Sequence, residues 1–153
     1  LSACNTVPAT QTPDTAVYVH HIYRPAPQPP APLSPLDDPN SVLARRSVYF
    51  GVNAAEVREA DRSLLRAHAE IMRANPSARR RNEGNADDRG GTHSNRLLAQ
   101  RRADNVRQFM LQAGVAPMAL EAISYGKDNP VDPAATEDAR ARNRRAELKY
   151  LAR

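Results

Sequence analysis

Proline is the feature that most constrains what this chain can fold into, because most of it lies at one end. Of the 13 prolines, nine lie before residue 41. Proline has no amide hydrogen to donate, and it restricts the residue before it to extended conformations. A regular helix or sheet is therefore not expected in this segment. The folded body has to come from the remaining residues, roughly 110 of them, which is enough for one modest core.

The charge of the chain divides at the same point. Residues 1–40 carry a net charge of −2 and residues 41–153 a net charge of +7. In the basic part, Arg is interleaved with Asp and Glu, and Trp is absent. This pattern is typical of a solvated surface of mixed charge rather than of a groove that binds nucleic acid. We therefore predict no nucleic-acid partner, and no apolar run is long enough for a transmembrane helix.

The first four residues, Leu1-Ser2-Ala3-Cys4, have the form of a bacterial lipobox. They resemble the cleavage site of a lipoprotein signal peptide whose earlier part is missing, so Cys4 is expected to become the acylated N-terminus. Each buried CH₂ of an acyl chain contributes roughly 0.8 kcal/mol, which predicts anchoring in membrane lipid. Asn5, rather than Asp, favours the outer membrane. The alternative is a chance sequence at the end of a fragment.

The expected organisation is a lipobox remnant at 1–4, a disordered Pro-rich tether at 5–41 and a folded domain at 42–153. Within the domain, apolar spacing and turn residues predict a β-α-β-α-β-α-β order. The predicted strands are 47–50, 78–84, 120–125 and 146–151, and the predicted helices are 55–74, 95–113 and 136–144. Alternating strands and helices indicate an α/β fold, a two-layer sandwich of one mixed sheet with helices packed on it.

The second predicted strand is unusual. Arg79, Arg80, Arg81 and Asn82 show no alternation of apolar and polar residues. Either this strand lies at an edge of the sheet, or polar residues replace the apolar ones that should face the core. Unpaired burial of such groups costs about 1–3 kcal/mol each, so we expect a less stable domain or a shifted strand.

The stretch from Glu83 to Val106 carries the candidate binding residues. Asp87 and Arg89 lie on a turn beside glycines, and Arg102 lies on the helix that follows. A carboxylate and a guanidinium so placed suit a small zwitterion, since Asp87 can take an ammonium and Arg102 can hold a carboxylate through two parallel N–H···O bonds. Asn95 is the expected N-cap of that helix, whose N-terminus favours anions. We find no Ser/His/Asp set, so we predict no enzyme.

Collinear motifs across residues 47–151 resemble a known family. They are VYF at 48–50, HAEIMRANPSAR at 68–79, EGNADDRGG at 83–91, QRRADNVR at 100–107, SYGKDNP at 124–130 and NRRAEL at 143–148. The family is the OmpA-like peptidoglycan-binding domain, in its peptidoglycan-associated lipoprotein form.

The resemblance implies non-catalytic binding of diaminopimelate, in the stem peptide of peptidoglycan, by an outer-membrane lipoprotein with its domain in the periplasm. It implies Asp87, Arg89, Leu98, Arg102 and Asn53 as ligand contacts, supported by Asn95, Asn143 and Arg144, without a cofactor or metal. It also implies a Tol-Pal system, with TolB and other Tol proteins as partners.

This chain departs from the family pattern at several positions, and structural alternatives remain for its site. Asn53 stands where the family often has a carboxylate, and Ser94 where it often has Tyr. These changes motivate an alternative function, a protein-interaction module that docks TolB with weakened or lost peptidoglycan binding. Asp87 is also suited to capping its own turn, and Arg102 to an ion pair with Asp87 or Glu83.

Structural alternatives also remain for Leu98 and for the supporting residue Arg144. Leu98 fits the core as well as a ligand contact, and Arg144 suits pinning the last helix to the sheet.

Overall fold

A computed structural model describes residues 34–153 of this chain. The predictions for Cys4, for the lipobox and for most of the tether fall on residues 1–33 and lie outside the described residues. Within the described part, no helix is both long enough and apolar enough to cross a bilayer.

The elements follow the predicted β-α-β-α-β-α-β order, with two short 3₁₀ turns added. They are η1 (Val42–Ala44), β1 (Ser47–Tyr49), α1 (Glu59–Ala74), β2 (Arg79–Gly84), α2 (Thr92–Gln112), η2 (Pro117–Ala119), β3 (Leu120–Ser124), α3 (Glu137–Asn143) and β4 (Arg145–Ala152). Helix α2 ends as its sequence indicates, since Gly114 adopts φ 94° just after it and the amide of Val115 bonds back to Met110 O at 3.1 Å.

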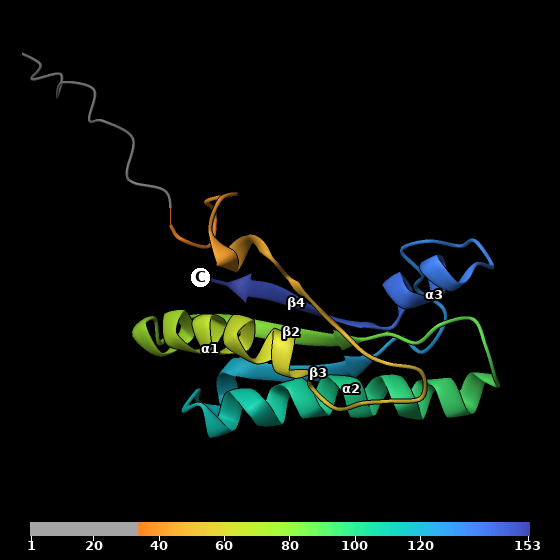
Figure 1. The fold of residues 1–153 in the computed structure, drawn as a ribbon. Helices are drawn as coiled ribbons and strands as arrows, with labels where there is room; N and C mark the ends of the chain where they lie inside the picture. Colours follow the sequence, from red (N-terminus) through yellow and green to blue (C-terminus); the bar gives the residue numbers. More distant parts are fainter. Residues whose placement is uncertain (1–33) are drawn as a thin grey trace, which may run out of the picture. The chain divides into compact units, whose positions relative to one another are not determined.

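The four strands form one sheet in the order β1-β4-β2-β3 (Figure 1). Strand β4 pairs antiparallel with both β1 and β2, and β2 pairs parallel with β3. The sheet is therefore mixed, as predicted. The loops after β1 and β2 belong to one end of the sheet, where the amides of Phe50 and Asn85 bond to the carbonyls of Arg144 and Arg145.

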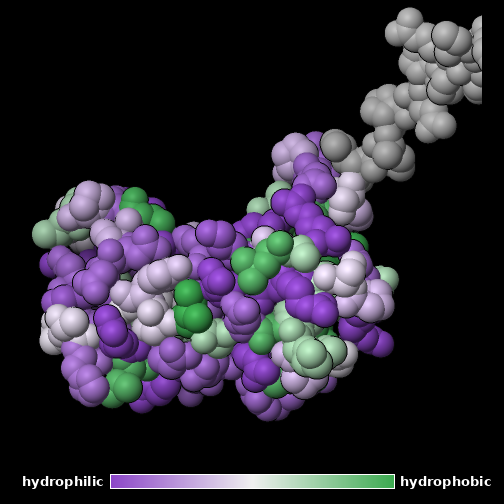
Figure 2. Space-filling model, turned by 180° about the vertical axis from the view of Figure 1, so that it is seen from behind, coloured by the Kyte–Doolittle hydropathy of each residue, from purple (hydrophilic) through white to green (hydrophobic). Residues whose placement is uncertain are grey.

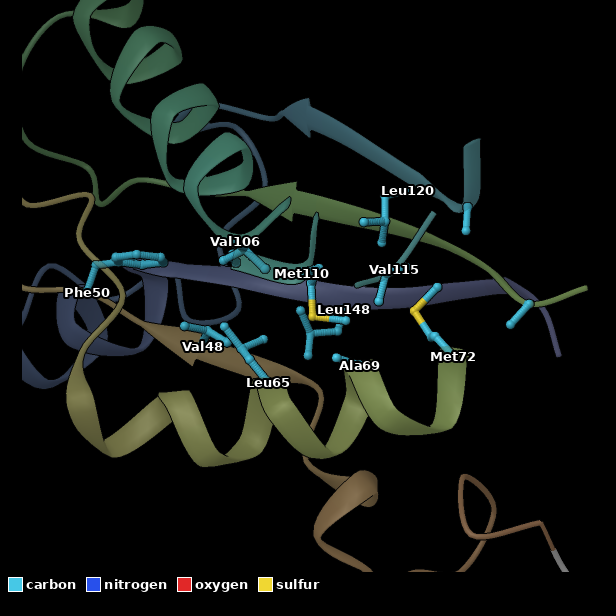
Figure 3. Packing of buried hydrophobic residues seen from close by; sticks show 13 residues of the cluster. Val48, Phe50, Leu65, Ala69, Met72, Val106, Met110, Val115, Leu120 and Leu148 are labelled. Atoms are coloured by element: carbon cyan, nitrogen blue, oxygen red, sulfur yellow. The ribbon is translucent and has the colours of Figure 1, made fainter. Parts of the chain in front are cut away.

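Both long helices cover the same face of the sheet and share one hydrophobic core (Figure 3). The core includes Leu65 and Met72 of α1, Val106 and Met110 of α2, and Leu148 of β4. The two helices approach the strands closely. A Cβ placed on Gly84 of β2 would lie 1.8 Å from the carbonyl oxygen of Ala99 in α2. Burial of these apolar side chains stabilises the packing of the helices on the sheet, which is the two-layer arrangement predicted from the sequence.

The polar strand β2 is not an edge, because it lies between β4 and β3. The second of the two alternatives is the correct one: Arg80 and Asn82 occupy core-facing positions and are fully buried. Asn82 Nδ2 donates to Glu121 O at 3.0 Å, whereas no guanidinium nitrogen of Arg80 has a hydrogen-bond partner among residues 34–153. The pairing of β2 with β4 is irregular at Arg79 and Arg80, so the register shifts beside the buried arginine.

Arg81 and Glu83, which alternate with the core-facing residues of β2, each bond to another side chain. Arg81 Nε donates to Glu121 Oε2 at 3.0 Å, and Tyr125 donates to Glu83 Oε2 at 2.8 Å. The molecule seen from behind in Figure 2 is mainly hydrophilic, with scattered hydrophobic residues. Interleaved charges of this kind agree with the solvated mixed-charge surface predicted from the sequence.

Helix α1 begins at Glu59, four residues later than the predicted start at 55. The reason lies in contacts with α2. Arg102 Nε donates to Ala54 O at 2.8 Å, and Asn105 Nδ2 donates to Ala55 O at 2.7 Å. These long-range bonds hold the carbonyls that a helix starting at 55 would use for its own first turn.

The folded body starts before the predicted boundary at residue 42. Leu36 is buried, and its carbonyl accepts a hydrogen bond from Arg46 Nη2 at 2.7 Å. Arg46 Nε also donates to Leu43 O at 2.8 Å. Residues 34–41, assigned to the tether by their proline content, are thus connected to the body, through Arg46 and through an ion pair between Asp37 and Arg153.

Candidate ligand-binding site

A polar cavity of about 290 Å³ lies where the loops after β1 and β2 meet the first turns of α2. Its lining combines residues from separate parts of the chain. They are Val52, Asn53, Asp87, Arg89, Gly90, Asn95, Leu98 and Arg102. The structure therefore brings all five predicted ligand contacts, and Asn95, around one cavity.

Asp87 is already bonded within the protein. Its Oδ1 accepts from the backbone amide of Arg89 at 3.1 Å, so it does cap its own turn. Its Oδ2 accepts from Arg89 Nη2 at 2.9 Å and from Arg144 Nη1 at 3.2 Å. Burial raises the pKa of Asp87, but these hydrogen bonds lower it by more, and the resulting pKa lies below the ordinary value. The carboxylate is thus charged and only partly free for a ligand.

Arg144 holds this carboxylate from behind the cavity. It ends α3, its side chain is 9% exposed, and its Nε donates to Phe50 O at 3.1 Å. Its Nη1 also lies 3.2 Å from Glu137 Oε1. One buried arginine therefore joins the end of α3, the loop after β1 and Asp87, which fits its predicted supporting place and its pinning role.

The prediction that Arg102 grips a ligand carboxylate through two parallel bonds stays a prediction, but most of its donors are already used inside the protein. Its side chain is fully buried at the base of the cavity. Nε, Nη1 and Nη2 donate to the carbonyls of Ala54, Asn85 and Gly51 at 2.8, 2.8 and 3.1 Å. The predicted alternative, an ion pair with Asp87 or Glu83, is not formed. Burial lowers the pKa of Arg102 to about 10, which still leaves it charged at neutral pH.

These bonds give Arg102 a structural task in addition to any contact with a ligand. It ties three loop carbonyls around the cavity. A guanidinium has five N–H groups, so two remain uncommitted.

The expected N-cap at Asn95 is also wrong. Helix α2 begins at Thr92 with Gly91 as its N-cap, and Asn95 lies within the first turn. The chain reaches the helix early because Gly90 adopts φ 86°, a left-handed conformation that glycine tolerates. Asn95 Nδ2 instead donates to Arg89 O at 2.7 Å, which holds the Asp87–Arg89 turn against the helix.

The remaining predicted residues differ in their positions. Asn53 lines the cavity with φ 51°, a left-handed conformation in which Asn is enriched. Leu98 is 8% exposed and lines the cavity wall as well as packing in the interior. Asn143 does not line the cavity. Its Oδ1 accepts from the amide of Val131 at 2.9 Å and its Nδ2 donates to Asp132 O at 2.7 Å, so it fixes that loop.

Three participants were not found from the sequence. Val52 and Gly90 line the cavity, and Glu137 approaches Arg89 Nη1 at 3.6 Å. Val52 carries no chemical signal, because its role is to form a wall. Glu137 follows Thr136, a helix-cap residue, so its sequence position indicates a favourable first-turn acid rather than a place near Arg89.

The cavity has a charged lining whose groups are partnered within the protein. Its charged lining residues are two arginines and one aspartate, a net charge of plus one. All three charges are held by hydrogen bonds inside the protein. The cavity volume of about 290 Å³ lies at the small end of the range for ligand pockets, which measure about 300–1,000 Å³.

A mixed four-stranded sheet with two long helices on one face and this loop cavity define an OmpA-like domain. The model of the OmpA family matches residues 49–144, and the chain belongs to that family.

The chain is similar to the peptidoglycan-associated lipoprotein of Haemophilus influenzae, 38% identical over 104 residues that cover 68% of each chain. It also resembles the crystal structure of the peptidoglycan-associated lipoprotein from Burkholderia pseudomallei, with 41% identity and a TM-score of 0.76 over 76% of this chain and 99% of that one. The C-terminal domain of Helicobacter pylori MotB shares the fold at 26% identity and a TM-score of 0.65, over 70% and 84% of the two chains. The resemblance predicted from the motifs is confirmed.

Proposed function

We propose that this chain is a non-catalytic peptidoglycan-binding protein whose cavity holds the zwitterionic end of a diaminopimelate side chain. The observation that carries the proposal is the shared cavity of Asn53, Asp87, Arg89, Leu98 and Arg102. A guanidinium and a carboxylate within one small cavity complement a ligand end that bears an ammonium and a carboxylate. The names of the similar lipoproteins, which describe association with peptidoglycan, support the same ligand.

The proposal extends to the position of the protein in the cell envelope. Acylated Cys4 anchors the chain in the outer membrane, and the Pro-rich segment lets the body reach the cell wall. TolB and other Tol proteins are the proposed protein partners. The lipobox form of residues 1–4 and the lipoprotein relatives support this part.

Sedimentation with purified sacculi tests the proposed function. The chain should pellet with diaminopimelate-type sacculi and remain largely soluble with Lys-type sacculi. Arg89→Ala should weaken binding about tenfold, because one charge-assisted bond contributes roughly 1.5–3 kcal/mol. Arg62→Ala is the matched control, since Arg62 is an exposed arginine in an ion pair on α1 and its loss changes the net charge equally. Equal pelleting of all three proteins with both wall types would contradict the proposal.

A second function, docking to TolB with weakened wall binding, is favoured by one observation. Asp87 is already paired with Arg89 and Arg144, and neutral Asn53 adds no charge to attract an ammonium. Under this function the chain binds purified TolB and fails to pellet with sacculi of either type. The sedimentation experiment therefore separates the two functions.

A further inference from the structure

We propose that the cavity recognises its ligand mainly through the ligand's carboxylate, and that Asn53 sets this preference. The inference rests on the proposed function, because it states which half of the diaminopimelate end group gives the affinity. A diaminopimelate end carries one ammonium and one carboxylate, and the cavity does not treat them equally.

The charges around the cavity favour an anion. Its lining holds the guanidiniums of Arg89 and Arg102 but only the carboxylate of Asp87. Arg144 and Glu137 contact the lining residues Asp87 and Arg89, and they pair with each other. Their opposite charges cancel, so the net charge around the cavity stays positive. Asn53, an exposed residue of the lining next to Val52, is polar but neutral. An entering ammonium meets a positive site, whereas an entering carboxylate meets a complementary one.

The capacity of Asp87 for an ammonium is also limited. Its two oxygens offer about four acceptor positions. Three are used, two by Arg89 and one by Arg144. A ligand ammonium has to compete with two guanidiniums, one of them buried, for the remaining contact.

Donors for a carboxylate are less committed. The Arg89 side chain is 42% exposed, and beyond its bond to Asp87 its one further ionic contact within residues 34–153 is a distant one, 3.6 Å from Glu137. Arg102 has two N–H groups beyond its three bonds to carbonyls, but its side chain is fully buried, so Arg89 is the more accessible donor. The positive side of the site therefore has spare hydrogen-bonding capacity, and the negative side has little.

Asn53 is the residue through which this preference can be changed. Its φ of 51° lies in the left-handed region, which both Asn and Asp adopt more readily than other non-glycine residues. Asn53→Asp therefore adds a carboxylate to the lining with little backbone strain. It also brings the lining charge to zero, which should restore the contribution of the ligand's ammonium.

Three tripeptides of the form L-Ala-γ-D-Glu-X test the inference by titration calorimetry with the full chain at low salt. X is meso-diaminopimelate, 2-aminopimelate, which lacks the end ammonium, or L-lysine, which lacks the end carboxylate. The 2-aminopimelate peptide should bind within about threefold of the diaminopimelate peptide, and the lysine peptide about tenfold more weakly or worse. In the Asn53→Asp variant, the affinity for the 2-aminopimelate peptide should fall about fivefold relative to the affinity for the diaminopimelate peptide. Asn40→Asp, the same change at an exposed turn, should leave the ranking unaltered.

The order of the three peptide affinities in the unmodified chain tests the carboxylate preference without any variant. If diaminopimelate binds and 2-aminopimelate binds as weakly as lysine, the inference is overturned while the proposed function stands. An unchanged ranking in Asn53→Asp overturns the role of Asn53. No binding of any of the three peptides overturns both the inference and the proposed function.

Discussion

Arg144 Nη1 lies 3.2 Å from Asp87 Oδ2, and this ion pair is almost enclosed, with the two side chains 9% and 10% exposed. It connects the end of α3 to the turn that carries the candidate binding residues. Arg89 bonds the same oxygen at 2.9 Å from the outside, with its side chain 42% exposed. The two arginines hold one carboxylate, but one is buried and the other is largely exposed. Their contributions to the free energy of unfolding should therefore differ.

Arg144→Met should destabilise the protein much more than Arg89→Met. Removing one partner of a buried ion pair costs about 3–5 kcal/mol, and the loss for Arg144→Met should lie at the low end of this range because Arg89 still pairs with Asp87. An exposed pair contributes about 1 kcal/mol or less. Urea denaturation at neutral pH measures both. Similar losses of unfolding free energy in the two variants would show that the buried pair with Arg144 stabilises the protein no more than the exposed pair with Arg89.

Stability should fall in mild acid because of His68. This buried imidazole accepts from Tyr150 at Nδ1 (2.8 Å) and donates from Nε2 to Arg45 O (2.9 Å), so it is held neutral. Burial, and to a smaller extent the nearby Arg80, lower the pKa of His68 from 6.5 to about 4. Between these values the unfolded chain binds a proton that the folded chain does not, so stability is full above pH 6.5 and declines toward pH 4.

The size of this loss is about 3 kcal/mol over the window, at 1.36 kcal/mol for each pKa unit. Denaturation midpoints measured from pH 7.5 to pH 4 test it. His68→Gln should flatten the dependence in this range. His93→Gln, at an exposed histidine of α2, should not. A dependence that survives unchanged in His68→Gln would assign the transition to another group.

Arg80→Met should raise the stability of the protein. Arg80 is fully buried, and its guanidinium has no hydrogen-bond partner among residues 34–153. The guanidinium lies over the ring of Tyr150, 5.9 Å from the ring centre, which is a favourable contact. Burial lowers the pKa of Arg80 to about 10, which reflects the cost of keeping the charge in the interior.

Replacing the charge by an apolar side chain of similar length should gain about 1–3 kcal/mol, measured as a higher denaturation midpoint. Arg81→Met is the control, because Arg81 is paired with Glu121 at the surface, and it should change stability by less than about 1 kcal/mol. A loss of stability in Arg80→Met would mean that the contact with Tyr150 outweighs desolvation.

Gly84→Ala should be strongly destabilising, because the added methyl group meets the backbone of α2 at Ala99 rather than a movable side chain. Forcing the helix away from the sheet should cost about 3 kcal/mol or more. In Gly51→Ala the added carbon would lie 3.6 Å from Ala54 Cβ, an ordinary contact, so little change is expected. Comparison of the two melting temperatures checks the prediction. Equal values would show that β2 and α2 are less tightly packed than described.

The order of elements could be predicted because the helices and outer strands bear their own local signals. Leu64, Leu65 and Met72 recur at helical spacing, and Gly114 marks the end of α2. The central position of β2 could not be predicted, since Arg80 and Asn82 remove the alternation that identifies a buried strand. Only pairing with β4 on one side and β3 on the other reveals it.

Within the site, the residue types could be predicted from the motif but their bonding could not. Asp87, Arg89 and Arg102 are close in the sequence, and their gathering around one cavity follows from a turn that leads into a helix. The carbonyl partners of Arg102 come from Gly51, Ala54 and Asn85, and the partner of Asp87 from α3. Such long-range contacts leave no local pattern in a single sequence.

A crystal structure of the protein with L-Ala-γ-D-Glu-meso-diaminopimelate bound would locate the ligand directly. We expect the free end of diaminopimelate to lie in the cavity bordered by Asn53, Asp87, Arg89 and Arg102, with its carboxylate on the arginine side. A peptide bound elsewhere, with this cavity unchanged and empty under saturating ligand, would contradict this expectation.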